Sequence, residues 1–85
     1  MTREETKKAM YELAELELIG LLVYRAKLRI MAHTCESEFI ATEVRVTEIR
    51  MREAEAELVN RQFACEEAGI PVVRHAALAA MWGEK

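Results

Sequence analysis

Residues 44–65 read VRVTEIRMREAEAELVNRQFAC, a run of 22 residues without glycine or proline. One set of its members recurs every seven residues, namely Val44, Met51, Leu58 and Cys65. A seven-residue repeat of apolar and small side chains is typical of an α-helix that packs along another helix. Glu57 and Arg61 stand four residues apart, in the order that supports an exposed helical face. The stretch therefore predicts a long helix, about 38–68, with one packed face.

The residues before this stretch predict a first long helix, about 3–32. Thr2 can cap its start, and Glu4 and Glu5 occupy the first turn, where the helix dipole favours acidic side chains. Gly20 is its single interruption. Between residues 16 and 24, apolar side chains surround much of the circumference. Residues 33–38 are expected to form the turn to the second helix.

The end of the chain predicts a short third helix, about 71–82. Gly69 suits the left-handed position after a helix end, and Pro71 suits the first position of the next helix. Residues 72–82 are almost entirely apolar, so this helix must lie in a groove. The expected fold is all-α, with two long antiparallel helices, a short third helix and a helical bundle completed by dimerisation.

Composition narrows the class of protein. The 85 residues form one domain, 52% of them are apolar, and glycine and proline are too few for a strand-rich fold. The net charge of −3 and pI of about 5.4 argue against a general binder of nucleic acid or membrane surfaces. The longest apolar run, residues 18–24, is too short to span a bilayer. We expect a cytoplasmic protein with no membrane partner.

The first helix carries more apolar surface than one hairpin can bury. We therefore expect a homo-oligomer, most simply a two-fold dimer. Six residues are the expected interface: Leu16, Ile19, Val23, Val44, Met51 and Leu58.

Histidine and cysteine give no sign of a metal centre. His33, Cys35 and Glu36 form one candidate group, but their spacing matches no common ligand motif. The same is true of a second group, Cys65, Glu66 and His75. We expect no metal and no cofactor, and two reduced, buried cysteines.

Residues 64–73 resemble the turn of a helix-turn-helix motif, with a small residue before a glycine and apolar residues after it. The following helix would offer only Arg74 and His75 as polar contacts. Specific reading of base edges needs several polar side chains. DNA binding is therefore the third of the functions that we consider.

One further pattern runs along the first helix: Lys8, Tyr11, Glu12, Glu15, Leu18, Ile19, Leu21, Leu22, Arg25 and Leu28. It resembles the first helix of the all-helical, AroQ-type chorismate mutases. Residues 69–73 followed by Leu78 resemble the entry to the third helix of that family, and Val44-Arg45 and Arg52-Glu53 resemble its second-helix motif. The resemblance is tight only over residues 8–28.

The resemblance implies an intertwined helical dimer that encloses a small dianionic substrate. In such a site Lys8 and Arg25 would hold carboxylates, and Arg52 and Glu53 would be the second-helix pair. Catalysis would then rest on positioning and electrostatic stabilisation. Glu36 departs from the pattern, because the family places a cation at this position against the ether oxygen. The third helix also stops at Trp82, before the polar residues that many members carry.

These observations leave two leading hypotheses. The first is a non-catalytic protein–protein interaction module, an adaptor or an inhibitor, which rests on surplus apolar faces and mixed exposed charges. The second is a chorismate mutase-like enzyme, or a degenerate relative that binds a small dicarboxylate.

Overall fold

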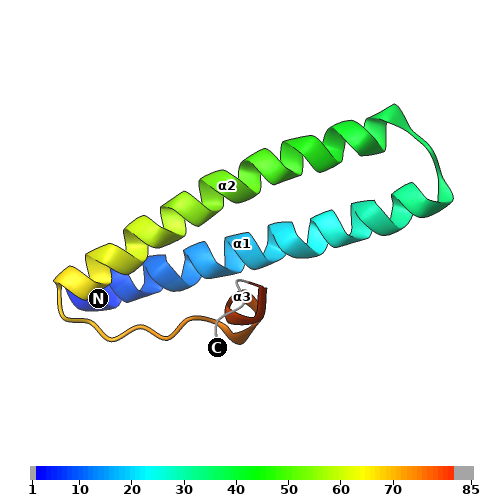
Figure 1. Ribbon diagram of the computed structural model, residues 1–85. Coiled ribbons are helices and arrows are strands. Elements are labelled where there is room, and N and C mark those ends of the chain that lie inside the picture. Colours follow the sequence, from blue (N-terminus) through cyan, green and yellow to red (C-terminus); the bar gives the residue numbers. More distant parts are fainter. Residues whose placement is uncertain (1, 82–85) are drawn as a thin grey trace.

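The computed structural model describes residues 2–81, and within them it contains three helices and no strand. Helix α1 spans Arg3–Thr34, α2 spans Glu38–Glu67 and α3 spans Ala76–Met81. The two long helices run antiparallel and are joined by a short turn (Figure 1). The all-α prediction of two long helices and a short third one is confirmed.

A heptad seam holds α1 and α2 together. On α2 the buried residues are Ile40, Thr47, Met51, Ala54, Leu58 and Cys65. On α1 they include Tyr11, Ala14, Leu18 and Leu28. Both sets follow alternating steps of three and four residues, or sums of such steps, so the seven-residue seam predicted for α2 is confirmed.

The seam corrects the expected interface between chains. Met51 and Leu58 are only 4% and 1% exposed, and Val44 is half-buried. Met51 and Leu58 lie in one buried cluster with Leu18 of α1 in the same chain. Met51 and Leu58 therefore belong to the core of the hairpin and are not available to a second chain, whereas Val44 keeps part of its side chain exposed.

The ends of the long helices are capped as the sequence suggests. The Thr2 hydroxyl accepts a hydrogen bond from the Glu5 amide at 3.1 Å. Gly69 has a φ of +72°, the left-handed conformation that glycine adopts easily. The amide of Ile70 donates to the carbonyl of Cys65 at 2.9 Å, and that of Gly69 to Glu66 at 3.0 Å. This is a Schellman motif, which ends α2 and turns the chain back.

The third helix begins later than predicted. Residues 70–75 are extended and form a strap, and α3 starts only at Ala76. Burial alternates along the strap: Ile70 is buried and Val72 and Arg74 are half-buried, whereas Pro71, Val73 and His75 are exposed. This two-residue period suits an extended segment on an apolar surface. The predicted end at Trp82 lies outside the described residues.

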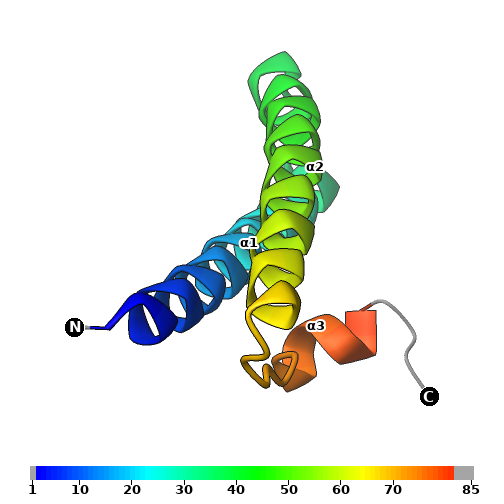
Figure 2. The same cartoon turned by 90° about the vertical axis from the view of Figure 1, so that its left-hand side faces the viewer.

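The strap and α3 cover one side of the open end of the hairpin (Figures 1 and 2). Leu78 of α3 is fully buried in a cluster with Leu18, Leu58 and Ile70. The rest of the hairpin extends beyond this cluster, and the molecule measures 49 × 26 × 18 Å. Its accessible surface is 6276 Å², against about 5,200 Å² for a compact monomer of this mass. The elongated shape therefore leaves an excess of surface.

Candidate functional site

The outward side of α1 carries a row of large apolar side chains, which we call the α1 stripe: Leu13, Leu16, Ile19, Val23 and Ile30, with Gly20 among them. Leu16, Val23 and Ile30 recur every seven residues and are 59%, 49% and 67% exposed. At 100° per residue, this row lies on the side of α1 opposite to the seam. The packing of α1 on α2 therefore does not use Leu16, Val23 and Ile30. Ile19, at the edge of the stripe, is half-buried and packs against the core cluster.

Gly20 lies inside the α1 stripe, and no contact between the described residues requires a glycine at that position. A Cβ atom added to it would meet nothing within 4 Å. A glycine in the middle of a helix costs about 1 kcal/mol relative to alanine. Neither the turn nor the packing of the hairpin requires that cost.

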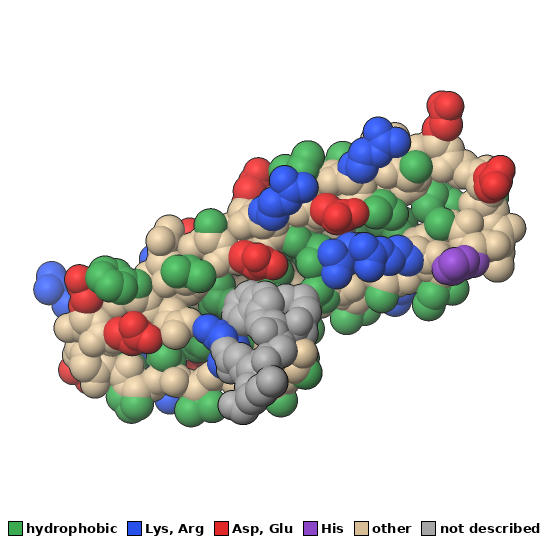
Figure 3. Space-filling view, viewed as in Figure 1, with side chains coloured by type: hydrophobic (Ala, Val, Ile, Leu, Met, Phe, Trp, Pro, Cys, Tyr) green, Lys and Arg blue, Asp and Glu red, His purple; other side chains and the backbone are tan. Residues whose placement is uncertain are grey.

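A second row follows the outward side of α2, which we call the α2 stripe: Phe39, Val46, Ile49, Val59 and Phe63. Phe39 and Phe63 are 71% and 58% exposed. Ile49 and Phe63 stand two heptads apart on the side of α2 that faces away from α1. Hydrophobic side chains accordingly appear along both long edges of the molecule (Figure 3).

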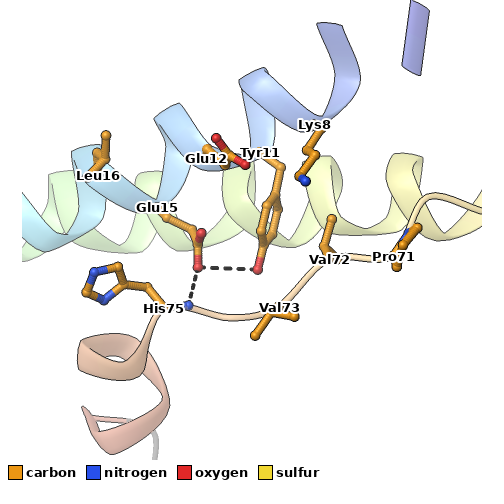
Figure 4. Close-up of a pocket in the computed structure, with 9 residues that line it drawn as sticks. All are labelled: Lys8, Tyr11, Glu12, Glu15, Leu16, Pro71, Val72, Val73 and His75. Carbon is orange, nitrogen blue, oxygen red and sulfur yellow. Dashed lines mark hydrogen bonds between the residues drawn. The ribbon is translucent and has the colours of Figure 1, made fainter. Parts of the chain in front are cut away.

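A pocket of about 440 Å³ lies between α1 and the strap (Figure 4). Its lining comprises Lys8, Tyr11, Glu12, Glu15, Leu16, Pro71, Val72, Val73 and His75. Glu15 is the unusual member, because a carboxylate that is only 6% exposed needs hydrogen-bond partners. One of its oxygens, Oε2, accepts from the Tyr11 hydroxyl at 3.3 Å and from the His75 amide at 2.6 Å.

These contacts tie the strap to both long helices. Glu15 holds the His75 amide from α1, and Gln62 of α2 accepts a hydrogen bond from Arg74 at 3.1 Å. His75 in turn caps α3, because its Nδ1 accepts from the Ala77 amide at 3.1 Å. Glu15 thus acts as a structural clamp on the strap.

Tyr11 is protonated in this environment. Burial raises the pKa of its hydroxyl above the ordinary value, and the negative charge of Glu15 and the hydrogen bond to Glu15 raise it further. A protonated hydroxyl is the form that can donate to the carboxylate. The hydrogen bond to Glu15 therefore depends on the proton of the Tyr11 hydroxyl.

The residues assigned through the mutase resemblance are not brought together within one chain. Lys8 lies beside the strap pocket, and Arg25 is half-buried 17 residues farther along α1, which is about 25 Å of helix. Arg52 lies with Arg45, Glu48 and Ile49 around a shallow hollow of α2. Glu53 lines a different hollow, with Leu21 and Glu57. A site made of these residues would need a second chain.

The remaining sequence candidates are separated as well. Among residues 2–81, no three histidine, cysteine or acidic side chains lie close enough to hold a metal ion. Both cysteines are free, but the prediction that both are buried is wrong: Cys65 is buried, whereas Cys35 is exposed at the C-cap of α1. The extended strap also separates α2 from α3, so no helix follows the turn directly as a helix-turn-helix would require. No helix in the described part of the chain is long and apolar enough to cross a bilayer.

Sequence reasoning did not single out the clamp. Glu12, Glu15 and Glu17 look alike in the sequence, and Glu15 differs only in standing beside the seam, between Tyr11 and Leu18. Thr47 was missed for a related reason, because a hydroxyl is not expected on a buried row. Its hydroxyl donates to the carbonyl of Glu43 at 2.7 Å, which satisfies it inside the helix.

Comparison of the chain with protein-family models, with curated proteins and with solved structures finds no match.

Proposed function

We propose that the protein is a small helical protein–protein interaction module, an adaptor or an inhibitor, and not a catalyst. The observation that carries this proposal is the pair of outward stripes on α1 and α2. Their large apolar side chains are 36% to 71% exposed, except that Ile19 is half-buried and packs against the core cluster. Monomeric soluble proteins rarely keep long contiguous apolar rows in water, and such rows mark interaction sites.

The surroundings of the stripes suit a protein partner. The α2 stripe is bordered by charges of both signs, among them Arg45, Arg52, Glu53 and Glu66, all of which are exposed. An apolar centre with a charged rim is the usual anatomy of a protein interface. A helix laid along such a row would place its own apolar side chains at positions i, i+3, i+4 and i+7.

We further propose that the module self-associates. The surface in excess of a compact monomer is about 1,100 Å², and one partner in a standard interface buries about 800 Å². Leu16, Ile19 and Val23 remain the expected interface residues, now as members of the α1 stripe. We also expect the module to work in the cytoplasm, because the exposed thiol of Cys35 suits a reducing compartment.

The mutase-like alternative has less support. It needs Lys8, Arg25 and Arg52 to converge on one dianion, whereas these residues lie on different parts of the hairpin. Glu36 remains an anion where the chemistry requires a cation. Conversion of chorismate by the purified protein, lost in Arg25→Ala, would favour this alternative over the interaction module.

Site-specific photo-crosslinking tests the module. A benzophenone amino acid replaces Phe63 on the α2 stripe, and in a matched control it replaces the exposed Arg50 on the flank of α2. In cells, we expect the Phe63 position to crosslink one defined protein that the control does not. The purified partner should then bind the wild-type chain and lose binding to Ile49→Glu. Equal crosslinking from both positions, or binding that Ile49→Glu leaves unchanged, would contradict the proposal.

A further inference from the structure

We infer that two copies of this chain pair antiparallel through their α1 stripes, about a two-fold axis close to Gly20. The inference rests on the proposed function, because it takes the α1 stripe to be an interaction surface. It adds the identity of the occupant, the orientation of the pair and the position of the axis. Three features of the structure support it: the shape of the stripe, the open glycine and the distribution of charge.

The α1 stripe can match a second copy of itself. It runs from Leu13 to Ile30, about 27 Å of helix, with Gly20 near its middle. A two-fold axis makes the same patch serve both partners. With the axis near Gly20, Leu16 of one copy comes alongside the region of Val23 in the other copy. The two Gly20 backbones then approach closely where neither copy carries a side chain.

The open glycine supports this position of the axis. No atom of the chain outside the helix itself lies within 4 Å of a Cβ built on Gly20. Glycine is found where another backbone must come near. A closely packed second helix supplies a backbone at this point, and the hairpin alone does not.

The charges decide the orientation. The half of the hairpin around the turn, residues 18–52, carries six basic and four acidic residues, so its net charge is +2. The described remainder, residues 3–17 and 53–81, carries five basic and ten acidic residues, so its net charge is −5. A parallel pair would set the two acidic halves side by side, whereas an antiparallel pair sets each acidic half beside a basic one.

The helix α1 repeats this asymmetry on its own. Its residues 18–34 contain Arg25, Lys27 and Arg29 and no acidic residue, while residues 3–17 contain five glutamates and three basic residues. Lys27 belongs to the exposed side of α1, close to the α1 stripe. In a parallel pair it would face its own copy near the axis. In an antiparallel pair it faces the acidic half that contains Glu12 and Glu17.

The wild-type chain already contains the probe that tests the orientation. Cys35 is exposed and Cys65 is fully buried, so a thiol-reactive spin label modifies Cys35 selectively. Cys35 lies 15 residues beyond Gly20, which separates two labels by about 45 Å along an antiparallel pair. In a parallel pair they would lie within about 20 Å, because packed helix axes are 8–10 Å apart. Pulsed electron paramagnetic resonance measures either distance.

Two matched variants locate the interface. Val23→Glu places a charge in the α1 stripe and should abolish the dimer, with helical circular dichroism unchanged. Val59→Glu makes the same change on the α2 stripe at similar exposure, 57% against 49%, and should leave the dimer intact. Added salt should weaken the wild-type dimer severalfold by about 0.5 M, since it screens unlike charges. Lys27→Gln should weaken the dimer as well.

A distance near 45 Å together with loss of the dimer in Val23→Glu supports the inference. A short distance, a dimer that salt strengthens, or dissociation by Val59→Glu with Val23→Glu still dimeric would overturn it. A monomeric wild type would overturn it too, as would larger assemblies made by α1 stripes on α2 stripes. In each of these cases, photo-crosslinking from position 63 still tests independently whether the protein is an interaction module.

Discussion

Glu15 offers the sharpest test of how the fold is held together. Replacing it by alanine removes the acceptor that holds the His75 amide at 2.6 Å and the Tyr11 hydroxyl at 3.3 Å. A hydrogen bond to a charged group contributes about 1.5–3 kcal/mol. The longer of the two bonds, from the Tyr11 hydroxyl, contributes less. The expected loss of unfolding free energy is therefore about 2–3 kcal/mol. For a domain of this size, that loss lowers the melting temperature by roughly 10–20 °C.

Control variants distinguish the loss of the Glu15 hydrogen bonds from the general effect of removing a side chain. Denaturant melts give the free energy of unfolding. The protein concentration is kept the same in all of them, because self-association makes the apparent stability depend on concentration. Glu15→Gln keeps an acceptor oxygen without the charge and should lose about 1 kcal/mol. Glu12→Ala, on the exposed neighbour, should change stability by less than about 0.5 kcal/mol.

Hydrogen exchange at the His75 amide gives a local readout of the same change. In Glu15→Ala the strap loses its attachment to α1, and exchange of this amide should accelerate more than that of amides in α2. The reasoning is refuted if Glu15→Ala and Glu12→Ala have equal stability, or if the His75 amide keeps its full protection when Glu15 is removed.

Three further outcomes follow from particular residues. The pKa of Tyr11 is raised in the fold by burial first and by Glu15 second. The stability that its proton contributes is therefore present below pH 10 and is lost as the pH rises through the folded pKa. In Tyr11→Phe, the unfolding free energy measured in alkaline melts should therefore fall less steeply with pH than in the wild type. Gly20→Ala should stabilise the isolated hairpin by about 0.5–1 kcal/mol, measured in a monomeric Val23→Glu background, because the added Cβ meets nothing; no gain would show that the glycine serves the hairpin. Reductant should not move the melting temperature, because both cysteines are free, and chelator should not move it, because no three metal-binding side chains lie together among residues 2–81; a fall of several degrees with either reagent would reveal a crosslink or a metal.

The sequence predicts the long helices well because their signals are local and repeated. Each signal favours one local structure, and the fold contains that structure. Thr2 caps α1, the glycine after α2 takes the left-handed conformation, and the row through Met51 and Leu58 is buried. The strap was not predicted, since Pro71 suits a helix start and an extended segment equally well. Its extended form depends on contacts with Glu15 and Gln62, which are distant in sequence.

The candidate interaction surface was predicted only in part. Excess apolar residues on α1 pointed to a partner, and Leu16 and Val23 are indeed exposed. The sequence does not indicate the α2 stripe, because Ile49, Val59 and Phe63 are spread among charged residues. The burial of Glu15 could not be read from its neighbours, because burial depends on where the strap returns.

The mass of the protein in solution tests the central claim most directly. Light scattering at micromolar concentrations should give twice the 9.8 kDa of the single chain for the wild type. The same measurement on Val23→Glu should give the single-chain mass, with helical content unchanged. A wild type that stays monomeric at every concentration, or a Val23→Glu variant that stays dimeric, would contradict the assignment of the α1 stripe as an interaction surface.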